Sequence, residues 1–235
     1  MKNFVFDLYG TLIDIHTDES DPSFRTKIAK EFFDLCGGEC DFWKEYISLC
    51  APPADDIYYE PDLISVFSAL ANRCGATLSR ESIEKFAYRF RLLSRKKLIL
   101  YPEIEDMLSS LKSLGAKVYL LSNAQACFTD REMEELGLTG YFDGILLSSN
   151  EGVKKPSERF FNILFERFGL DRKSTVYTGN DYYSDVLGAK AVGLYCAYIR
   201  TYNEAPLETV RKKADFVAED FKTLKEKLVL LAKEN

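Results

Sequence analysis

Residues 3–12 read NFVFDLYGTL and join a short apolar run to an acidic residue and a glycine turn. The apolar run predicts a buried strand, and the Tyr9-Gly10-Thr11 segment predicts the turn that ends it. Asp7 is therefore expected at the carboxyl end of this strand. Ligands of open α/β sheets bind at that edge of the sheet, so Asp7 is a candidate functional residue.

The second half of the chain alternates between strand and helix patterns. Pro102 suits a first helical position, and Gly115 suits the end of the helix that Pro102 begins. Beyond it, strands are expected at residues 117–121, 144–148, 175–177 and 195–199, and helices at 128–136, 156–168 and 182–191. The alternation predicts an α/β fold, a doubly wound parallel sheet with helices on both faces.

The segment between the first strand and this alternating half carries helical patterns only. Apolar residues recur there at three-to-four spacing, as in Phe24, Ile28, Phe32 and Leu35, and again in Leu63, Val66, Phe67 and Leu70. We therefore expect a Rossmann-like core of residues 1–14 and 98–235 and a helical cap of residues 15–97. The cap leaves and re-enters at the carboxyl edge of the sheet, so it should cover the site.

Composition excludes several classes of protein. The net charge is -6 with both signs interspersed, which argues against a nucleic acid partner. The chain has no run of roughly 20 apolar residues and no secretory apolar region at its start, so we expect a cytoplasmic protein without a membrane partner. Six cysteines without a CxxC pair suit free thiols in a reducing compartment. The sequence leaves the oligomeric state open.

His16 is the only histidine, so a histidine-rich zinc site is excluded. Other polar residues fall at or just beyond the expected strand ends, namely Asp7, Ser122 with Asn123, Lys155, and Asp181 with Asp185. Taken singly, residues of these types are more often caps, turn residues or solvated side chains. Their value as a signal lies in their order along the chain.

In that order they resemble the motifs of the haloacid dehalogenase superfamily: a strand-end Asp, a Ser or Thr, a Lys and an acidic pair. The matching segments are FVFDLYGTL, YPEIEDMLSSLKSLGAKVYLLSNA, SSNEGVKKPSERFF and VYTGNDYYSDVLGAKAVGL. The resemblance implies a hydrolase in which Asp7 is a covalent nucleophile. Lys155, which directly precedes Pro156, is preferred over Lys154 for the lysine of the third motif.

The resemblance also implies how the other residues act. Main-chain N–H groups after Asp7, at Leu8 and Tyr9, would meet phosphoryl oxygens together with Ser122, Asn123 and Lys155. Mg²⁺ would be held by Asp7, the Tyr9 carbonyl oxygen and Asp181, with Asp185 and Asn180 as further ligands, because oxygen ligands suit this cation. The alternative for Asp185 is a cap or an ion pair.

Tyr9 departs from the phosphatase pattern, which has a second Asp at this position to protonate the leaving group. A phenol is a poor proton donor at neutral pH. Phosphomonoester hydrolysis should then be impaired unless Asp14, His16 or a cap residue substitutes, and Tyr9→Asp should raise turnover of alkyl phosphates.

Three functions follow from these residues. We favour a magnesium-dependent phosphatase that acts on a small phosphorylated metabolite through an aspartyl-phosphate intermediate. The DxYGT form also occurs in metal-independent 2-haloacid dehalogenases of the superfamily, although Phe161 replaces their tyrosine and only Arg25 lies near the place of their cap arginine. The third alternative is a catalytically weak phosphate-binding protein.

Overall fold

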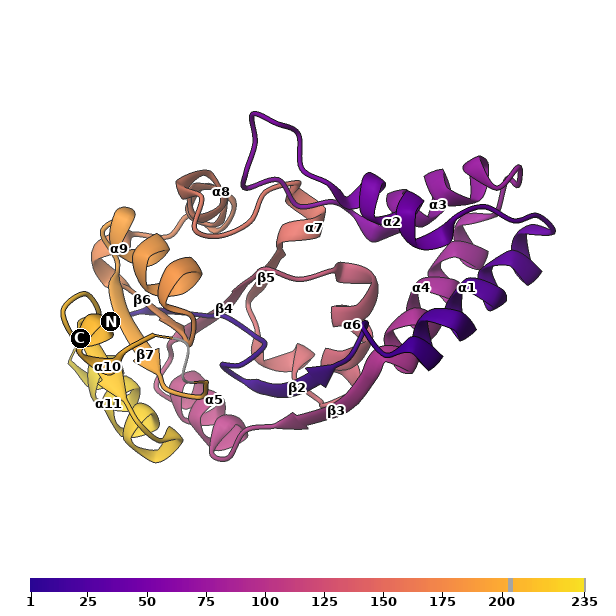
Figure 1. Ribbon diagram of the computed structural model, residues 1–235. Helices are drawn as coiled ribbons and strands as arrows, with labels where there is room; N and C mark the ends of the chain where they lie inside the picture. Colours follow the sequence, from indigo (N-terminus) through magenta and orange to yellow (C-terminus); the bar gives the residue numbers. More distant parts are fainter. Residues whose placement is uncertain (203–204, 235) are drawn as a thin grey trace.

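A six-stranded parallel sheet forms the centre of the computed structural model, which describes residues 1–202 and 205–234 (Figure 1). The strands lie in the order β5 (Gly144–Leu147), β4 (Lys117–Ser122), β1 (Asn3–Phe6), β6 (Thr175–Gly179), β7 (Tyr195–Ile199) and β8 (Phe216–Ala218). β1 is central, since Phe6 pairs with Leu120 of β4 and with Thr178 of β6. The expected α/β fold is confirmed.

Helices cover both faces of the sheet, as the strand sequences require. Phe4 and Phe6 are buried in one hydrophobic cluster and Val5 in another, because successive strand residues point to opposite faces. The first cluster includes residues of α5 (Ile104–Ser113) and α11 (Phe221–Lys233), and the second includes residues of α8 (Glu158–Phe168), α9 (Gly188–Ala191) and α10 (Leu207–Arg211). Burial on both faces explains why the strands read as continuous apolar runs.

Short helical elements complete the core. They are α6 (Ala126–Glu135), η1 (Thr139–Tyr141), α7 (Ser148–Glu151), η2 (Arg172–Ser174) and the π-helix η3 (Tyr182–Leu187). The amino group of Met1 donates a hydrogen bond of 2.6 Å to the carbonyl oxygen of Leu231, so the start of the chain lies against α11. Figure 1 shows both termini together, far from the cap helices.

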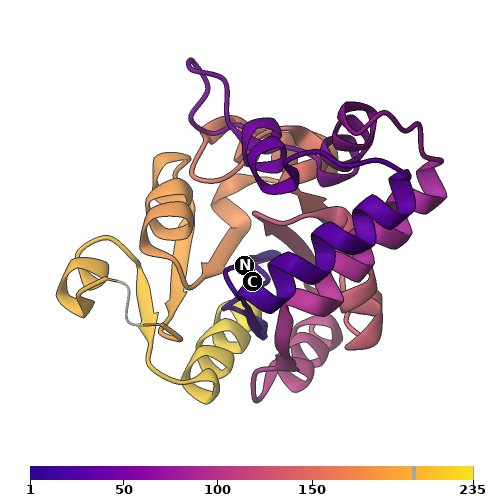
Figure 2. The same ribbon diagram turned by 45° about the vertical axis from the view of Figure 1, so that its right-hand side comes forward.

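Four helices form the cap, which lies over one side of the core (Figure 2). They are α1 (Pro22–Cys36), α2 (Phe42–Cys50), α3 (Leu63–Arg73) and α4 (Arg80–Ser94). Their interior contains many aromatic rings; for example, the ring centroids of Phe32 and Phe86 are 4.8 Å apart and those of Phe67 and Phe90 are 5.5 Å apart. Phe128 of α6 stacks on Phe90, so the cap interior continues onto the core.

A two-stranded antiparallel ribbon connects the cap to the core. β2 (Ile13–Thr17) pairs with β3 (Arg95–Leu100), and Asp14 lies opposite Ile99. The sequence analysis expected helix from residue 15 and missed this ribbon, because its two short strands are far apart in the chain and carry no local turn signal. The expected module boundaries, at residues 14–15 and 97–98, fall within the ribbon and stay a prediction.

Two further features differ from expectation. Cys40 and Cys74 form a disulfide that joins the start of α2 to the end of α3, so the expectation of six free thiols is wrong for this pair. The other four cysteines are free. Strand β8 and the two helices beside it were also missed, because the short FVA segment lacks a strand-length apolar run. Across residues 1–202 and 205–234, every helix is too short or too polar to cross a membrane.

Candidate active site

Asp7 follows β1, and its carboxylate is held by residues from three other places in the chain. Its Oδ1 accepts hydrogen bonds from Ser122 Oγ at 2.9 Å and from Lys155 Nζ at 2.7 Å. Its Oδ2 accepts a longer bond, 3.2 Å, from the hydroxyl of Thr11. Asp7 is only 7% exposed. The structure thus brings Asp7, Ser122 and Lys155 together, as expected from strands that end at one edge.

Lys155 bridges two carboxylates. Its Nζ donates to Asp7 and, at 2.7 Å, to Oδ1 of Asp185. Burial alone would lower the pKa of Lys155, but the two carboxylates outweigh burial and raise it. The ammonium ion therefore persists in a buried position and places a fixed positive charge against Asp7.

Asp185 lies in η3, the helix that follows β6, and accepts its hydrogen bond from Lys155 there. Its Oδ2 accepts hydrogen bonds from the main-chain N–H groups of Asn180 (3.0 Å) and Asp181 (2.9 Å). Burial raises the pKa of Asp185, and the Lys155 ammonium opposes that rise. Both carboxylate oxygens are thus engaged by protein donors, which matches the alternative of an ion pair better than a metal ligand.

Tyr177 of β6 completes the group, and the sequence analysis did not identify it. Its hydroxyl accepts from Lys155 Nζ at 2.8 Å and donates to Asp185 Oδ1 at 2.7 Å. Tyr177 is fully buried, and burial raises its pKa well above the ordinary value. A tyrosine inside an otherwise buried strand is the signal that could have found it, since a buried phenol needs a hydrogen-bond partner.

Asn123 positions Lys155 through the main chain. Its Oδ1 accepts from the N–H of Lys155 at 2.7 Å, and its Nδ2 donates to the Lys155 carbonyl oxygen at 3.1 Å. The amide is therefore engaged by the protein, and the expected contact of Asn123 with substrate stays a prediction. Lys154 instead lies 3.8 Å from Glu60 with a partly exposed side chain, so the geometry agrees with the preference for Lys155.

The cap reaches the same segment through a loop before α3. Tyr59 and Val153 form an antiparallel bridge, and the N–H of Lys154 donates to the carbonyl oxygen of Tyr58 at 2.9 Å. Gln125, two residues after Asn123, donates to Glu60 Oε1 and to the Pro61 carbonyl oxygen, each at 2.8 Å. A cap loop is thus bonded directly to the residues that precede Lys155.

The side chain of Tyr9 is directed toward α6 and α4. Its hydroxyl lies 2.5 Å from Oε2 of Glu132 and 3.0 Å from the hydroxyl of Thr129. Glu132 is fully buried and receives two hydrogen bonds from Arg91 of α4, at 2.8 and 3.2 Å. Burial, with a smaller contribution from Glu132, raises the pKa of Tyr9 above its ordinary value. The phenol therefore stays protonated and joins the Asp7 loop to the cap.

The loop after Asp7 is a tight turn. The carbonyl oxygen of Leu8 accepts hydrogen bonds from the N–H groups of Thr11, Leu12 and Ile13. Gly10 has a φ of 82°, and a Cβ at this position would collide with the side chain of Asn180. Any other residue would be strained here. The expected contacts of the Leu8 and Tyr9 N–H groups with a phosphoryl group stay predictions.

The expected magnesium ligands are only partly assembled. Oδ1 of Asn180 lies 3.1 Å from the Thr11 hydroxyl, which also contacts Asp7 Oδ2. Asp181 caps η3 by accepting a hydrogen bond from the N–H of Ser184. Within residues 1–202 and 205–234, no three or more His, Cys, Asp or Glu side chains are grouped to hold a metal ion.

Of the alternative residues considered from the sequence, Asp14, His16 and Arg25 lie away from Asp7, and Phe161 packs beside the group around Lys155. Asp14 forms an ion pair with Lys97 on the ribbon, and His16 is exposed on the same strand. The guanidinium of Arg25 lies 4.1 Å from the ring centroid of Trp43, among the cap helices. The ring of Phe161 packs against Tyr177 at 5.4 Å.

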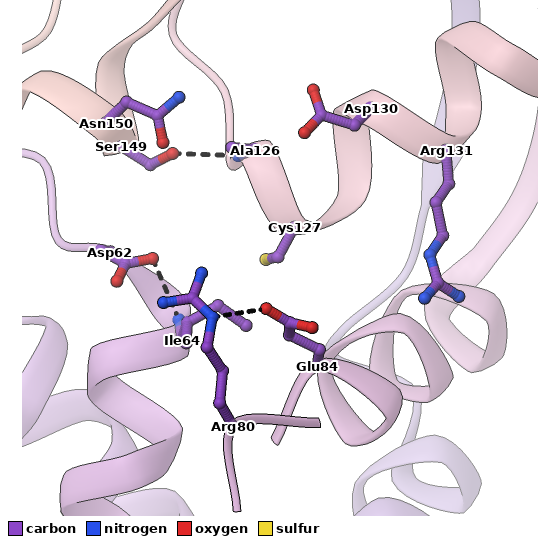
Figure 3. Close-up of a pocket in the computed structure, with 10 residues that line it drawn as sticks. All are labelled: Asp62, Ile64, Arg80, Glu84, Ala126, Cys127, Asp130, Arg131, Ser149 and Asn150. Carbon is purple, nitrogen blue, oxygen red and sulfur yellow. Dashed lines mark hydrogen bonds and ion pairs between the residues drawn. The ribbon is translucent and has the colours of Figure 1, made fainter. Parts of the chain in front are cut away.

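A cavity of about 620 Å³ lies between the cap and the core (Figure 3). It is lined by Asp62, Ile64, Arg80 and Glu84 of the cap and by Ala126, Cys127, Asp130, Arg131, Ser149 and Asn150 of the core. Figure 3 shows the thiol of Cys127 directed into this space. Asp7 is not among the lining residues, so the cavity and the buried carboxylate are separate.

Comparison with known proteins identifies the family of this chain. The sequence profile of the haloacid dehalogenase-like hydrolases matches residues 1–193. A ribulose-1,5-bisphosphate 5-phosphatase of Halopiger xanaduensis is 30% identical over 42% of this chain and 41% of its own length. An (S)-2-haloacid dehalogenase of Pseudomonas sp. strain YL is 25% identical over 86% of this chain and 84% of its own length.

A similar fold occurs in a HAD phosphatase from Thermococcus onnurineus. The two structures superpose with a TM-score of 0.63 at 21% identity, over 97% of this chain and 98% of the other. The chain spans about half the length of the curated phosphatases that it matches, but most of the length of the dehalogenase.

Proposed function

Because the chain belongs to the haloacid dehalogenase-like hydrolases, we propose that it hydrolyses a small phosphorylated metabolite through a phosphoryl ester on Asp7. The observation that carries this proposal is the arrangement around Asp7. One carboxylate oxygen is fixed by Ser122 and Lys155, and the other has only the longer contact to Thr11 among the hydrogen bonds found in the described part of the chain. A nucleophile needs one oxygen oriented and the other available.

The residues around Asp7 suit the transfer of a negatively charged phosphoryl group. The Lys155 ammonium would stabilise the charge on the phosphoryl oxygens as the bond to Asp7 forms. Ser122 is hydrogen-bonded to the Asp7 carboxylate and Tyr177 to the Lys155 ammonium, so these two charged groups need to move little during the reaction.

We further propose that Mg²⁺ assists, held by Asp7, the main-chain carbonyl oxygen of Tyr9 and Asp181, with Asn180 beside them. Every group in this set is an oxygen donor, which fits a hard cation. When bound, the ion would polarise the phosphoryl group and reduce repulsion between substrate and Asp7. We assign Asp185 a positioning role toward Lys155, because both of its oxygens already accept hydrogen bonds from the protein.

Dehalogenation is the second candidate, and Tyr9 is the observation that favours it. A halide leaves without a proton, so a site with a phenol in place of an acid would suffice. Two relatives aligned over most of their length are dehalogenases. Against this candidate, Arg25 lies beside Trp43, and Arg91 is already paired with Glu132, so neither guanidinium is available to bind a substrate carboxylate.

Release of phosphate from 4-nitrophenyl phosphate, with Mg²⁺ and with EDTA, tests the proposal. We expect metal-dependent release by the wild type and a loss of at least about 10³-fold in Asp7→Asn, because nucleophile and covalent intermediate are both removed. Full activity of Asp7→Asn would refute the assignment. Halide release from 2-chloropropionate in EDTA, together with no phosphate release, would instead establish the second candidate.

A further inference from the structure

Tyr9 stands two residues after Asp7, where the phosphatase pattern has its proton-donating Asp, and the Tyr9 hydroxyl is bonded elsewhere. The Tyr9 hydroxyl lies 2.5 Å from Oε2 of Glu132, and a phenol has one proton to donate. Glu132 is fully buried, and its partner Arg91 donates to both of its oxygens. Both oxygens of Glu132 therefore accept hydrogen bonds from Arg91, and the phenol proton of Tyr9 is donated to Glu132.

The second neighbour of Tyr9 does not change this assignment. The Thr129 hydroxyl lies 3.0 Å from the phenol oxygen and can donate to it while Tyr9 donates to Glu132. Arg95 lies 3.5 Å from the other oxygen of Glu132 and adds positive charge to the group. Turning the phenol toward a substrate would leave the buried Glu132 carboxylate without one of its hydrogen-bond donors. Losing a partner in this way costs free energy for a buried polar group.

On the cap side, burial raises the pKa of two carboxyl groups of the described residues, Glu19 and Glu60, and this makes them the alternative proton donors to consider. Glu19 precedes α1, is half-buried and interacts electrostatically with Arg91. Glu60 is bonded to Gln125 and lies near Lys154. Neither contacts Asp7, Ser122 or Lys155 through a hydrogen bond or ion pair found in the described residues, so neither is placed at the reacting group.

We propose that this site acts on phosphorylated substrates whose leaving group departs without a proton, above all acyl phosphates and phosphoanhydrides. The inference rests on the proposed function. It narrows the substrate class, because alkyl phosphates such as sugar and glycerol phosphates release an alkoxide. The conjugate acid of an alkoxide is about as weak an acid as water, so alkyl phosphates need an acid, and none is placed at Asp7 among the described residues.

The reaction balances without an acid for an acyl phosphate. An Asp7 oxygen forms a bond to phosphorus, and the bond between phosphorus and the bridging oxygen breaks. The substrate carboxylate leaves with the electron pair and stays ionised at neutral pH, since carboxyl groups have a pKa near ~4. A water oxygen then attacks phosphorus, the bond to Asp7 breaks, and the water proton passes to solvent. Without a positioned base this second step is slow, so the phosphoryl ester on Asp7 should accumulate.

The test is the dependence of kcat/KM on the leaving group, measured with acetyl phosphate, 4-nitrophenyl phosphate and glycerol 3-phosphate. The wild type should show a steep decline along this series and a burst of about one equivalent of acetate per site. Tyr9→Asp should raise the ratio of kcat/KM for glycerol 3-phosphate to kcat/KM for acetyl phosphate by about 100-fold or more. Tyr9→Phe serves as a second variant, because it removes the phenol proton without adding a carboxylate.

Each outcome decides the inference. A shallow series in the wild type, with full dependence on Asp7, would overturn the inference and leave the proposed function standing. If kcat/KM declines more steeply along the series in Tyr9→Phe, Glu19→Gln or Glu60→Gln than in the wild type, the replaced residue is a working acid. That result would also overturn the inference. An unchanged decline in these three variants, whatever their absolute rates, supports it. The absence of Asp7-dependent cleavage of every substrate would refute the proposed function, and the inference with it.

Discussion

Replacing Arg91 by methionine should strongly destabilise the protein through Glu132. The Glu132 side chain is fully buried, and that of Arg91 is only 10% exposed. Methionine retains most of the apolar stem of arginine but leaves Glu132 with a buried charge and fewer donors. Breaking a buried pair in this way typically costs 3–5 kcal/mol. Tyr9 and Arg95 remain near the carboxylate, so we take the lower value, about 3 kcal/mol, as the expected loss.

Thermal denaturation followed by circular dichroism measures this effect, with a midpoint expected to fall by roughly 6–12 °C in Arg91→Met. Arg89 provides a matched control on the same helix. It pairs with Glu31, but the side chains are 44% and 32% exposed, so Arg89→Met should cost less than about 1 kcal/mol. The double variant Arg91→Met with Glu132→Leu should recover most of the loss, because it removes both charges. A decrease in Arg91→Met no larger than that in Arg89→Met would refute the reasoning.

Three other changes test the remaining contacts. Asn123→Ala removes both side-chain bonds to the main chain of Lys155 and should lower kcat/KM about 10- to 100-fold in the 4-nitrophenyl phosphate assay, whereas an unchanged rate would show that Lys155 does not depend on it. Tyr177→Phe removes a buried donor to Asp185 and should cost about 1–3 kcal/mol in urea denaturation; no loss would mean that the phenol is dispensable. Burial raises the pKa of Glu60, so its contribution to stability is complete below its unfolded pKa and is lost as pH rises through the folded value. Glu60→Gln should therefore gain stability relative to the wild type between pH 4 and pH 7, and a parallel pH profile would contradict this.

The alternation of strands and helices in the core and the presence of a helical cap follow from local patterns in the sequence. Asp7 and Lys155 could be placed because each ends or follows a segment with a clear signal. The Tyr9–Glu132 contact could not be placed, because nothing in α6 distinguishes Glu132 from its three acidic neighbours in helix residues 130–135. The antiparallel ribbon was also missed, because paired residues such as Asp14 and Ile99 are separated in the sequence by the whole cap.

The segment that follows β4 also limits how the chain can be recombined with its relatives. Ser122 bonds to Asp7, Asn123 to Lys155, and Gln125 to the cap loop at Glu60 and Pro61. These neighbouring residues thus contact Asp7, Lys155 and the cap loop in turn. A chimera that exchanged the cap only at the two ribbon strands would separate Gln125 from its partners. Functional exchange should therefore require the cap and the residues after β4 to be transplanted as one unit.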